Sequence, residues 1–191
     1  MIEHAAAIDR LRARLRTASA NQAEYDGHRA AAVAVLLVDR GGVTHLPFTV
    51  RSDGLPSHSG QISFPGGTRD PDDGSFAMCA LRETREELGL ASNYIRVLGE
   101  LDDVPTPTGY TIRPVVAELD PAGAIYQPNP REVVEVFEQP LTAFTDPAFR
   151  EDLGAREYRG IHYRVHAYNL GGRRIWGATA RMVEQLVELL R

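Results

Sequence analysis

Residues 82–90 read Arg-Glu-Thr-Arg-Glu-Glu-Leu-Gly-Leu, and this stretch decides how the chain is interpreted. On a helix that turns about 100° per residue, Glu83, Glu86 and Glu87 fall within an arc of roughly 100°, so their carboxylates project from one patch. Like charges this close are destabilising unless a cation lies among them. Oxygen ligands of this kind suit Mg²⁺ or Mn²⁺, which proteins often share between carboxylates and substrate phosphates. The alternative is a solvated helix face paired with arginines.

The preceding residues, 64–73, read Phe-Pro-Gly-Gly-Thr-Arg-Asp-Pro-Asp-Asp and predict a loop. The paired glycines Gly66 and Gly67 let the backbone turn tightly and approach a ligand more closely than a side chain would allow. The Pro-Asp-Asp-Gly run then starts a helix predicted over Ser75–Leu88, which Gly89 ends. This loop in front of the carboxylates favours a ligand site over a solvated face.

The stretch from Gly67 to Leu90 resembles the Nudix box, G-x5-E-x7-R-E-U-x-E-E-x-G-U, where U is an aliphatic residue. It departs from that pattern in three ways. The first acidic position is Asp73, one residue is inserted before Arg82, and Thr84 occupies the first aliphatic position. These departures recur in one branch of the Nudix hydrolase family, the coenzyme A (CoA) pyrophosphatases. The chain therefore resembles this branch more specifically than the family as a whole.

A second signature of that branch, L-L-T-x-x-S-x-x-L-R-x-H-x-G-x-x-x-F-P-G-G, lies immediately upstream in one ungapped register. Its matching positions are Thr49, Ser52, Leu55, His58, Gly60, Phe64, Pro65, Gly66 and Gly67. The mismatches are Pro47 and Phe48 for the leucines and Pro56 for the arginine. Further matches downstream extend the resemblance over roughly residues 30–190.

The resemblance implies an α/β fold, the Nudix fold, in which an α/β/α sandwich surrounds a mixed β-sheet. The length of 191 residues fits one such domain. We expect residues 1–29 to form an added N-terminal amphipathic helix, predicted over His4–Ala18, and a linker. Residues 30–191 would form the Nudix hydrolase domain, with the box at 67–90. The predicted strands are 30–38, 43–50, 94–101, 110–119 and 133–137, followed by a short helix at 141–149, a hairpin at 158–169 and a helix at 179–190; residues 51–73 are predicted as loop.

For the site, the resemblance implies that Glu83 and Glu87 bind the divalent cations, Mg²⁺ or Mn²⁺. Glu86 is expected as an additional ligand, and the main-chain carbonyl of Gly67 as a further one. Arg82 is expected to orient the glutamates by ion pairing, with an ordinary surface arginine as the alternative.

Outside the box, Glu132 and Glu135 are both candidates for a general base or an extra metal ligand from a later loop, and the sequence does not choose between them. His58, from the second signature, is a candidate for contacting a phosphate or the pantetheine arm of the substrate. Arg69 and Arg51 are candidates for binding phosphate, because a guanidinium recognises phosphate oxygens bidentately. The alternatives are a structural histidine and solvent-exposed arginines.

The amino-acid composition excludes several kinds of catalysis and binding. All 21 basic side chains are arginine, so Schiff-base catalysis by lysine and the phosphate loop that ends in Gly-Lys are excluded. The net charge of −5 argues against a general nucleic-acid or membrane-surface binder. The single cysteine, Cys79, cannot form an internal disulfide, and no signal-peptide pattern is present, so we expect a cytoplasmic protein, monomeric or homodimeric.

The resemblance therefore implies metal-dependent hydrolysis of the pyrophosphate bond of CoA or a CoA thioester, giving 4′-phosphopantetheine and adenosine 3′,5′-bisphosphate. One alternative is a Nudix pyrophosphatase for ADP-ribose, nucleotide sugars or nucleoside polyphosphates. Another, from a different class, is a non-catalytic Nudix-like module that binds a nucleotide and regulates a partner.

Overall fold

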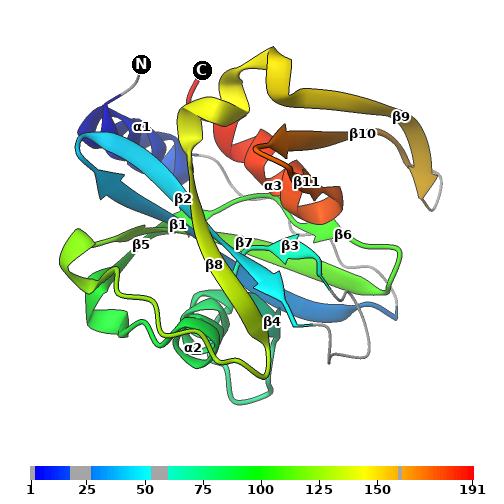
Figure 1. The fold of residues 1–191 in the computed structure, drawn as a ribbon. Helices are drawn as coiled ribbons and strands as arrows, with labels where there is room; N and C mark the ends of the chain where they lie inside the picture. The colour runs from blue at the N-terminus through cyan, green and yellow to red at the C-terminus, as the bar shows by residue number, and fades with distance from the viewer. Residues whose placement is uncertain (1–2, 18–26, 53–59, 159–160) are drawn as a thin grey trace.

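The computed structural model describes residues 3–17, 27–52, 60–158 and 161–191, and shows helices on both faces of a mixed β-sheet (Figure 1). The strands of this sheet are β1 (Arg29–Arg40), β2 (Val43–Arg51), β3 (Ile62–Ser63), β4 (Gly66–Thr68), β5 (Ile95–Glu100), β6 (Val104–Pro105), β7 (Tyr110–Leu119) and β8 (Val133–Pro140). A second sheet holds β9 (Arg150–Tyr158), β10 (Ile161–Leu170) and β11 (Arg173–Trp176). The helices are α1 (His4–Thr17), α2 (Phe76–Leu88) and α3 (Gly177–Glu188), with short 3-10 helices η1 (Ser92–Tyr94), η2 (Pro121–Gly123), η3 (Leu141–Thr145) and η4 (Pro147–Phe149).

Strand β1 lies at the centre of the main sheet. It pairs in parallel with β7 from Arg29 to Val38 and antiparallel with β2 and β4. Alternate residues of β1 enter two different cores, with Leu36 on the α2 side and Leu37 on the side of α1 and α3. Because both faces are covered, β1 is a continuous apolar run. The predicted α/β sandwich around a mixed sheet is confirmed.

Residues of the local sequence determine where helix α2 begins and ends. The hydroxyl of Ser75 accepts a hydrogen bond from the Met78 N–H at 3.1 Å, and Gly89, with φ of 69°, ends the helix in the left-handed conformation. Cys79 and Ala80 face the sheet and are fully buried. Met78, which the periodicity places near the apolar side, is instead 56% exposed.

The opposite face is covered by α1 and α3, which lie side by side above the sheet (Figure 1). Leu11 of α1 is fully buried in the same core as Val183 of α3. The arginines of α1 also bond the final carbonyls of the chain: Arg14 donates to the Leu189 carbonyl at 2.9 Å, and Arg10 donates to Leu190. Cations are favourable at a helix C-terminus, so α1 stabilises the end of α3 as well as its side.

Three parts of the chain differ from the prediction. The segment 51–73 is not all loop, because it holds β3 and β4, which are too short to show a period of two. Strand β9 was not predicted, since its sequence is mostly polar. The helix predicted at 141–149 is two 3-10 helices, separated where Asp146 caps the second through the Ala148 N–H. Within the described ranges, no helix is long and apolar enough to cross a membrane.

The burial of α1 gives a stability prediction. We expect Leu11→Ala to lower the free energy of unfolding by about 2–5 kcal/mol, because it removes a fully buried side chain and leaves a cavity. Ile125 is 68% exposed, so the control Ile125→Ala should change stability by less than about 0.5 kcal/mol. Urea unfolding measures both variants, and equal effects would contradict a core role for α1.

Candidate active site

The backbone of β4 lies directly against the carboxylate-bearing side of α2. A Cβ atom built on Gly67 would come within 2.4 Å of the Glu83 carboxylate, and one on Gly66 within 2.3 Å of the Ala32 carbonyl oxygen. A side chain at Gly66 would collide with the β1 backbone, and a side chain at Gly67 would displace the Glu83 carboxylate. The glycine pair therefore brings backbone and carboxylate together, the close approach that the sequence indicates for a ligand.

Arg82 connects four polar groups around this contact. Its Nη1 donates to Glu83 Oε1 at 2.9 Å and to Glu86 Oε2 at 3.2 Å. Its Nε and Nη2 donate to the two Asp73 oxygens at 3.1 and 2.9 Å, and Nη2 also donates to the Thr68 carbonyl at 3.2 Å. The hydrogen bonds from Arg82 lower the pKa of Asp73 to about 2. Arg82 thus pairs with the glutamates, as expected.

Glu87 is the most buried of the glutamates, with 3% of its surface exposed. Its Oε2 accepts a hydrogen bond from the Gly66 N–H at 3.2 Å, and its Oε1 lies 3.8 Å from Arg51 Nη1. Burial raises the pKa of Glu87 to about 8, against the opposing effects of Arg51 and the Gly66 N–H. Burial also raises the pKa of Glu83, which Arg82 opposes. The positive charge around Glu83 and Glu87 therefore does not fully compensate for the burial of their carboxylates.

Of the two later glutamates, Glu132 lies near the cluster. Its negative charge contributes to the raised pKa of both Glu83 and Glu87. Its segment is fastened to the end of α2, where the Gln127 N–H donates to the Leu88 carbonyl at 2.8 Å. Glu135 instead pairs with Arg173 on β11, whose Nη2 lies 2.6 Å from Glu135 Oε1.

The proposed substrate contacts have different surroundings. Arg51, at the end of β2, lies beside Glu87. Arg69 is engaged away from the carboxylates, because its Nε and Nη2 donate to the Asp73 carbonyl at 3.2 and 2.9 Å and its guanidinium lies over the Phe76 ring. His58 lies outside the described residues. Glu86 is exposed on the outer side of α2.

Asn129 is a residue of this site that the sequence analysis missed. Its backbone and side chain contact both Glu87 and Glu132. The available signal was an asparagine held between Pro128 and Pro130, a pattern that fixes a turn next to a candidate acid.

The residues present fit a divalent cation. Among the described residues, no three His, Cys, Asp or Glu side chains already surround one point, because Arg82 draws Glu83 and Glu86 toward itself. The donors nevertheless have the oxygen chemistry that Mg²⁺ and Mn²⁺ prefer. The buried Glu87, the nearby charge of Glu132 and the Cβ-free edge of Gly67 leave a negative region that a cation would neutralise.

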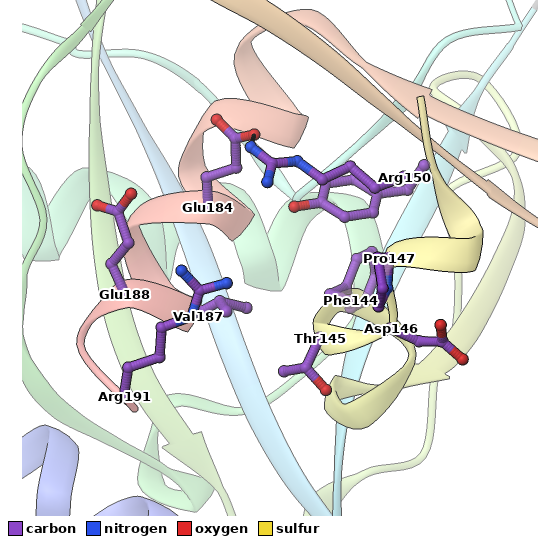
Figure 2. Close-up of a pocket in the computed structure, with 10 residues that line it drawn as sticks. Phe144, Thr145, Asp146, Pro147, Arg150, Glu184, Val187, Glu188 and Arg191 are labelled. Atoms are coloured by element: carbon purple, nitrogen blue, oxygen red, sulfur yellow. Dashed lines mark hydrogen bonds and ion pairs between the residues drawn. The ribbon is translucent and has the colours of Figure 1, made fainter. Parts of the chain in front are cut away.

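A hollow of about 280 Å³ lies elsewhere, between η3, η4 and α3 (Figure 2). None of the predicted site residues lines it. Arg150 and Arg191 project into it beside Glu184 and Glu188, and Arg150 Nη2 is bonded to Glu184 Oε1 at 3.0 Å (Figure 2). Because the hollow holds none of the predicted site residues, the carboxylates of α2 remain the candidate active site.

The sequence of this chain is similar to a known protein family and to individual members of it. Residues 27–159 match the family model of the NUDIX domain. A Photorhabdus laumondii protein named Uncharacterized Nudix hydrolase NudL is 37% identical over 163 residues, covering 85% of this chain and 86% of its own. The protein of the same name from Yersinia pestis (strain Pestoides F) is 36% identical over 161 residues, covering 84% and 79%.

Solved structures share the fold. The NUDIX domain of Shewanella oneidensis NrtR, complexed with ADP ribose, superposes with a TM-score of 0.56 at 16% identity, covering 87% of this chain and 91% of that one. The Nudix hydrolase RenU from M. smegmatis gives a TM-score of 0.51 at 24% identity, covering 63% and 75%. At these identities the likeness is evidence for the fold alone.

The Arg82–Asp73 pair predicts a pH-dependent contribution to stability. The pKa of Asp73 is lower in the folded protein than the ordinary value of 3.8, so the stabilisation is present above pH 3.8 and is lost as pH falls toward 2. We expect Asp73→Asn to lower the free energy of unfolding by about 1–3 kcal/mol at pH 7. Urea unfolding at pH 7, 5, 4 and 3 should show this difference shrinking with acidity; a constant difference would contradict the ion pair.

Proposed function

Since this chain belongs to the NUDIX domain family, we propose that it hydrolyses the pyrophosphate bond of CoA and CoA derivatives, giving 4′-phosphopantetheine and adenosine 3′,5′-bisphosphate. The observation that carries the proposal is the contact between the α2 glutamates and the Gly66–Gly67 backbone, because these glycines end the CoA-branch signature. The end of the segment that resembles the CoA-branch signature therefore lies against the carboxylates, which supports the proposal.

Described residues of that signature hold the strands that lead into Gly66 and Gly67. The Thr49 hydroxyl donates to the Ser63 carbonyl at 3.1 Å and so fastens β3 to β2. Phe64 is buried and stacks on Phe48 at 4.8 Å between ring centroids. These contacts fix the direction in which the chain enters Gly66 and Gly67, which supports a common purpose for the two motifs.

Glu83 and Glu87 would hold the divalent cation, with Glu86 and the Gly67 carbonyl as further ligands. When bound, Mg²⁺ or Mn²⁺ supplies charge neutralisation of the pyrophosphate and lowers the pKa of a coordinated water. Glu83 would exchange its pairing with Arg82 for the cation, and Arg82 would keep its two hydrogen bonds to Asp73.

We assign roles to the remaining candidate residues. We assign Glu132 as the general base, because its carboxylate lies within electrostatic reach of Glu83 and Glu87 and can accept a proton from the attacking water. Arg51 neutralises phosphate charge beside Glu87. Arg69 contributes through Nη1, which makes no hydrogen bond within the described residues, and His58 is assigned to the substrate on the signature alone.

The proposed reaction is the cleavage by water of one phosphorus–oxygen bond of the pyrophosphate. The water oxygen attacks one phosphorus, the bond from that phosphorus to the bridging oxygen breaks, and the bridging oxygen leaves on the other phosphate. Glu132 takes one proton of the water, and positive charge from Arg51 stabilises the developing charge on the phosphates.

The substrate assignment is tested with CoA, ADP-ribose and a dinucleoside polyphosphate, each incubated with Mg²⁺ or Mn²⁺. We expect 4′-phosphopantetheine and adenosine 3′,5′-bisphosphate from CoA, separated by chromatography. Consumption of ADP-ribose or the dinucleoside polyphosphate while CoA survives would overturn the CoA assignment and leave a Nudix pyrophosphatase. Binding of these compounds without turnover would instead identify a nucleotide-binding regulator.

The metal-ligand assignment has a separate test. Glu83→Gln and Glu87→Gln should each lower kcat at least ~100-fold, because an amide binds a divalent cation far more weakly than a carboxylate does. The fold should be retained, as circular dichroism will show. Glu188→Gln, on the exposed end of α3, is the matched control and should keep normal activity. Near-normal activity in both α2 variants would refute the assignment.

A further inference from the structure

Asn129 connects the two halves of the site through its backbone. Its N–H donates to the Glu87 carbonyl at 2.9 Å, at the last turn of α2. Its own carbonyl accepts the N–H groups of Glu132 at 3.0 Å and Val133 at 2.8 Å. Any residue with a backbone N–H can make these bonds, so they do not explain why the position is asparagine.

The side chain adds two contacts of a different kind. Asn129 Nδ2 donates to Glu132 Oε1 at 3.0 Å, and Oδ1 accepts the Arg131 N–H at 3.2 Å. A carboxylate only accepts hydrogen bonds and a backbone N–H only donates them, so the two partners together fix which way the amide faces. The amide therefore holds one oxygen of Glu132 in a defined place.

The flanking prolines make this arrangement rigid. Pro128 and Pro130 each fix their own φ, and a residue that precedes proline is restricted to extended conformations. The backbone at Asn129 thus has little freedom, and the bond to Glu87 ties it to α2. A side chain on such a support is held in place before any ligand binds, which is the requirement for precise placement of a reacting group.

We propose that Asn129 is a positioning residue whose side-chain amide orients the Glu132 carboxylate beside Glu83 and Glu87 for proton transfer. This inference rests on the proposed function, in which Glu132 is the general base. Asn129 touches neither the substrate nor the reacting water in this scheme; it acts only through Glu132.

A double-mutant cycle tests this dependence. Asn129→Asp keeps the size of the side chain and the acceptor for Arg131, but places a carboxylate against Glu132. We expect it to lower kcat for CoA about 10–100-fold with little change in KM, the usual cost of losing a supporting hydrogen bond. In a Glu132→Gln background the same change should alter kcat less than about twofold, because the oriented carboxylate is already absent.

The second sheet offers a matched control. Asn169 Nδ2 donates to Glu151 Oε2 at 3.2 Å, the same pair of groups on β10 and β9. Asn169→Asp makes the same chemical change away from the α2 carboxylates and should leave kcat unchanged. Asn129→Ala, which adds no charge, is a second variant, and urea unfolding of each protein shows that the comparison is made on folded chains.

Three results would overturn the positioning role: normal kcat in Asn129→Asp and Asn129→Ala, an equal loss in both Glu132 backgrounds, or full activity of Glu132→Gln. Should the wild-type chain consume ADP-ribose and not CoA, the cycle is run with ADP-ribose. The expected dependence on Glu132 would then support Asn129 even though the CoA assignment had failed.

Discussion

The contact between the Gly67 backbone and the Glu83 carboxylate is the constraint on which the rest of the site depends. A Cβ at Gly67 would lie 2.4 Å from an oxygen of that carboxylate, so the absence of a side chain leaves room for Glu83 beside β4. Gly66 sets the other side, because a Cβ there would strike the β1 backbone. Helix α2 can therefore lie close enough for Glu87 to accept the Gly66 N–H, and this also buries the carboxylate. One steric requirement thus produces both the geometry and the raised pKa values.

Such a site is costly to the folded protein when no cation is bound. Burial penalises the charges of Glu83 and Glu87, and Glu132 adds repulsion. Arg82 offsets part of this by pairing with Glu83 and Glu86, whereas the arginine beside Glu87 among the described residues is Arg51, at 3.8 Å. The stability lost here is recovered in the two cores that pack on β1. Storing unfavourable charge where a cation binds is what a metal-dependent site requires, since the bound cation then gains the interaction that the protein lacks.

Much of this arrangement was readable from the sequence because it is local. The spacing of Glu83, Glu86 and Glu87 on one helix and the paired glycines before it are encoded within 25 residues, from Gly66 to Leu90. The choice between Glu132 and Glu135 was not readable, because it depends on how residues 127–133 bond to the end of α2. Strand β9 was missed for a related reason: its polar residues owe their extended form to pairing with β10, and pairing leaves no periodic signal in a strand exposed on both faces.

The all-arginine composition takes on a structural meaning in this fold. Three arginines each donate hydrogen bonds from Nε and Nη2 to the two oxygens of one carboxylate. The pairs are Arg82 with Asp73, Arg113 with Asp103 and Arg40 with Glu138. The Arg82 and Arg113 pairs fix irregular chain to α2 and to β7, whereas the Arg40 pair joins β1 to β8. Glu138 also accepts the hydroxyl of Tyr126, from the segment that leads to Glu132. A lysine ammonium has no planar fork and would hold the carboxylate at a point, leaving it free to rotate. The segments that carry the candidate base are therefore placed by the geometry of the guanidinium as well as by its charge.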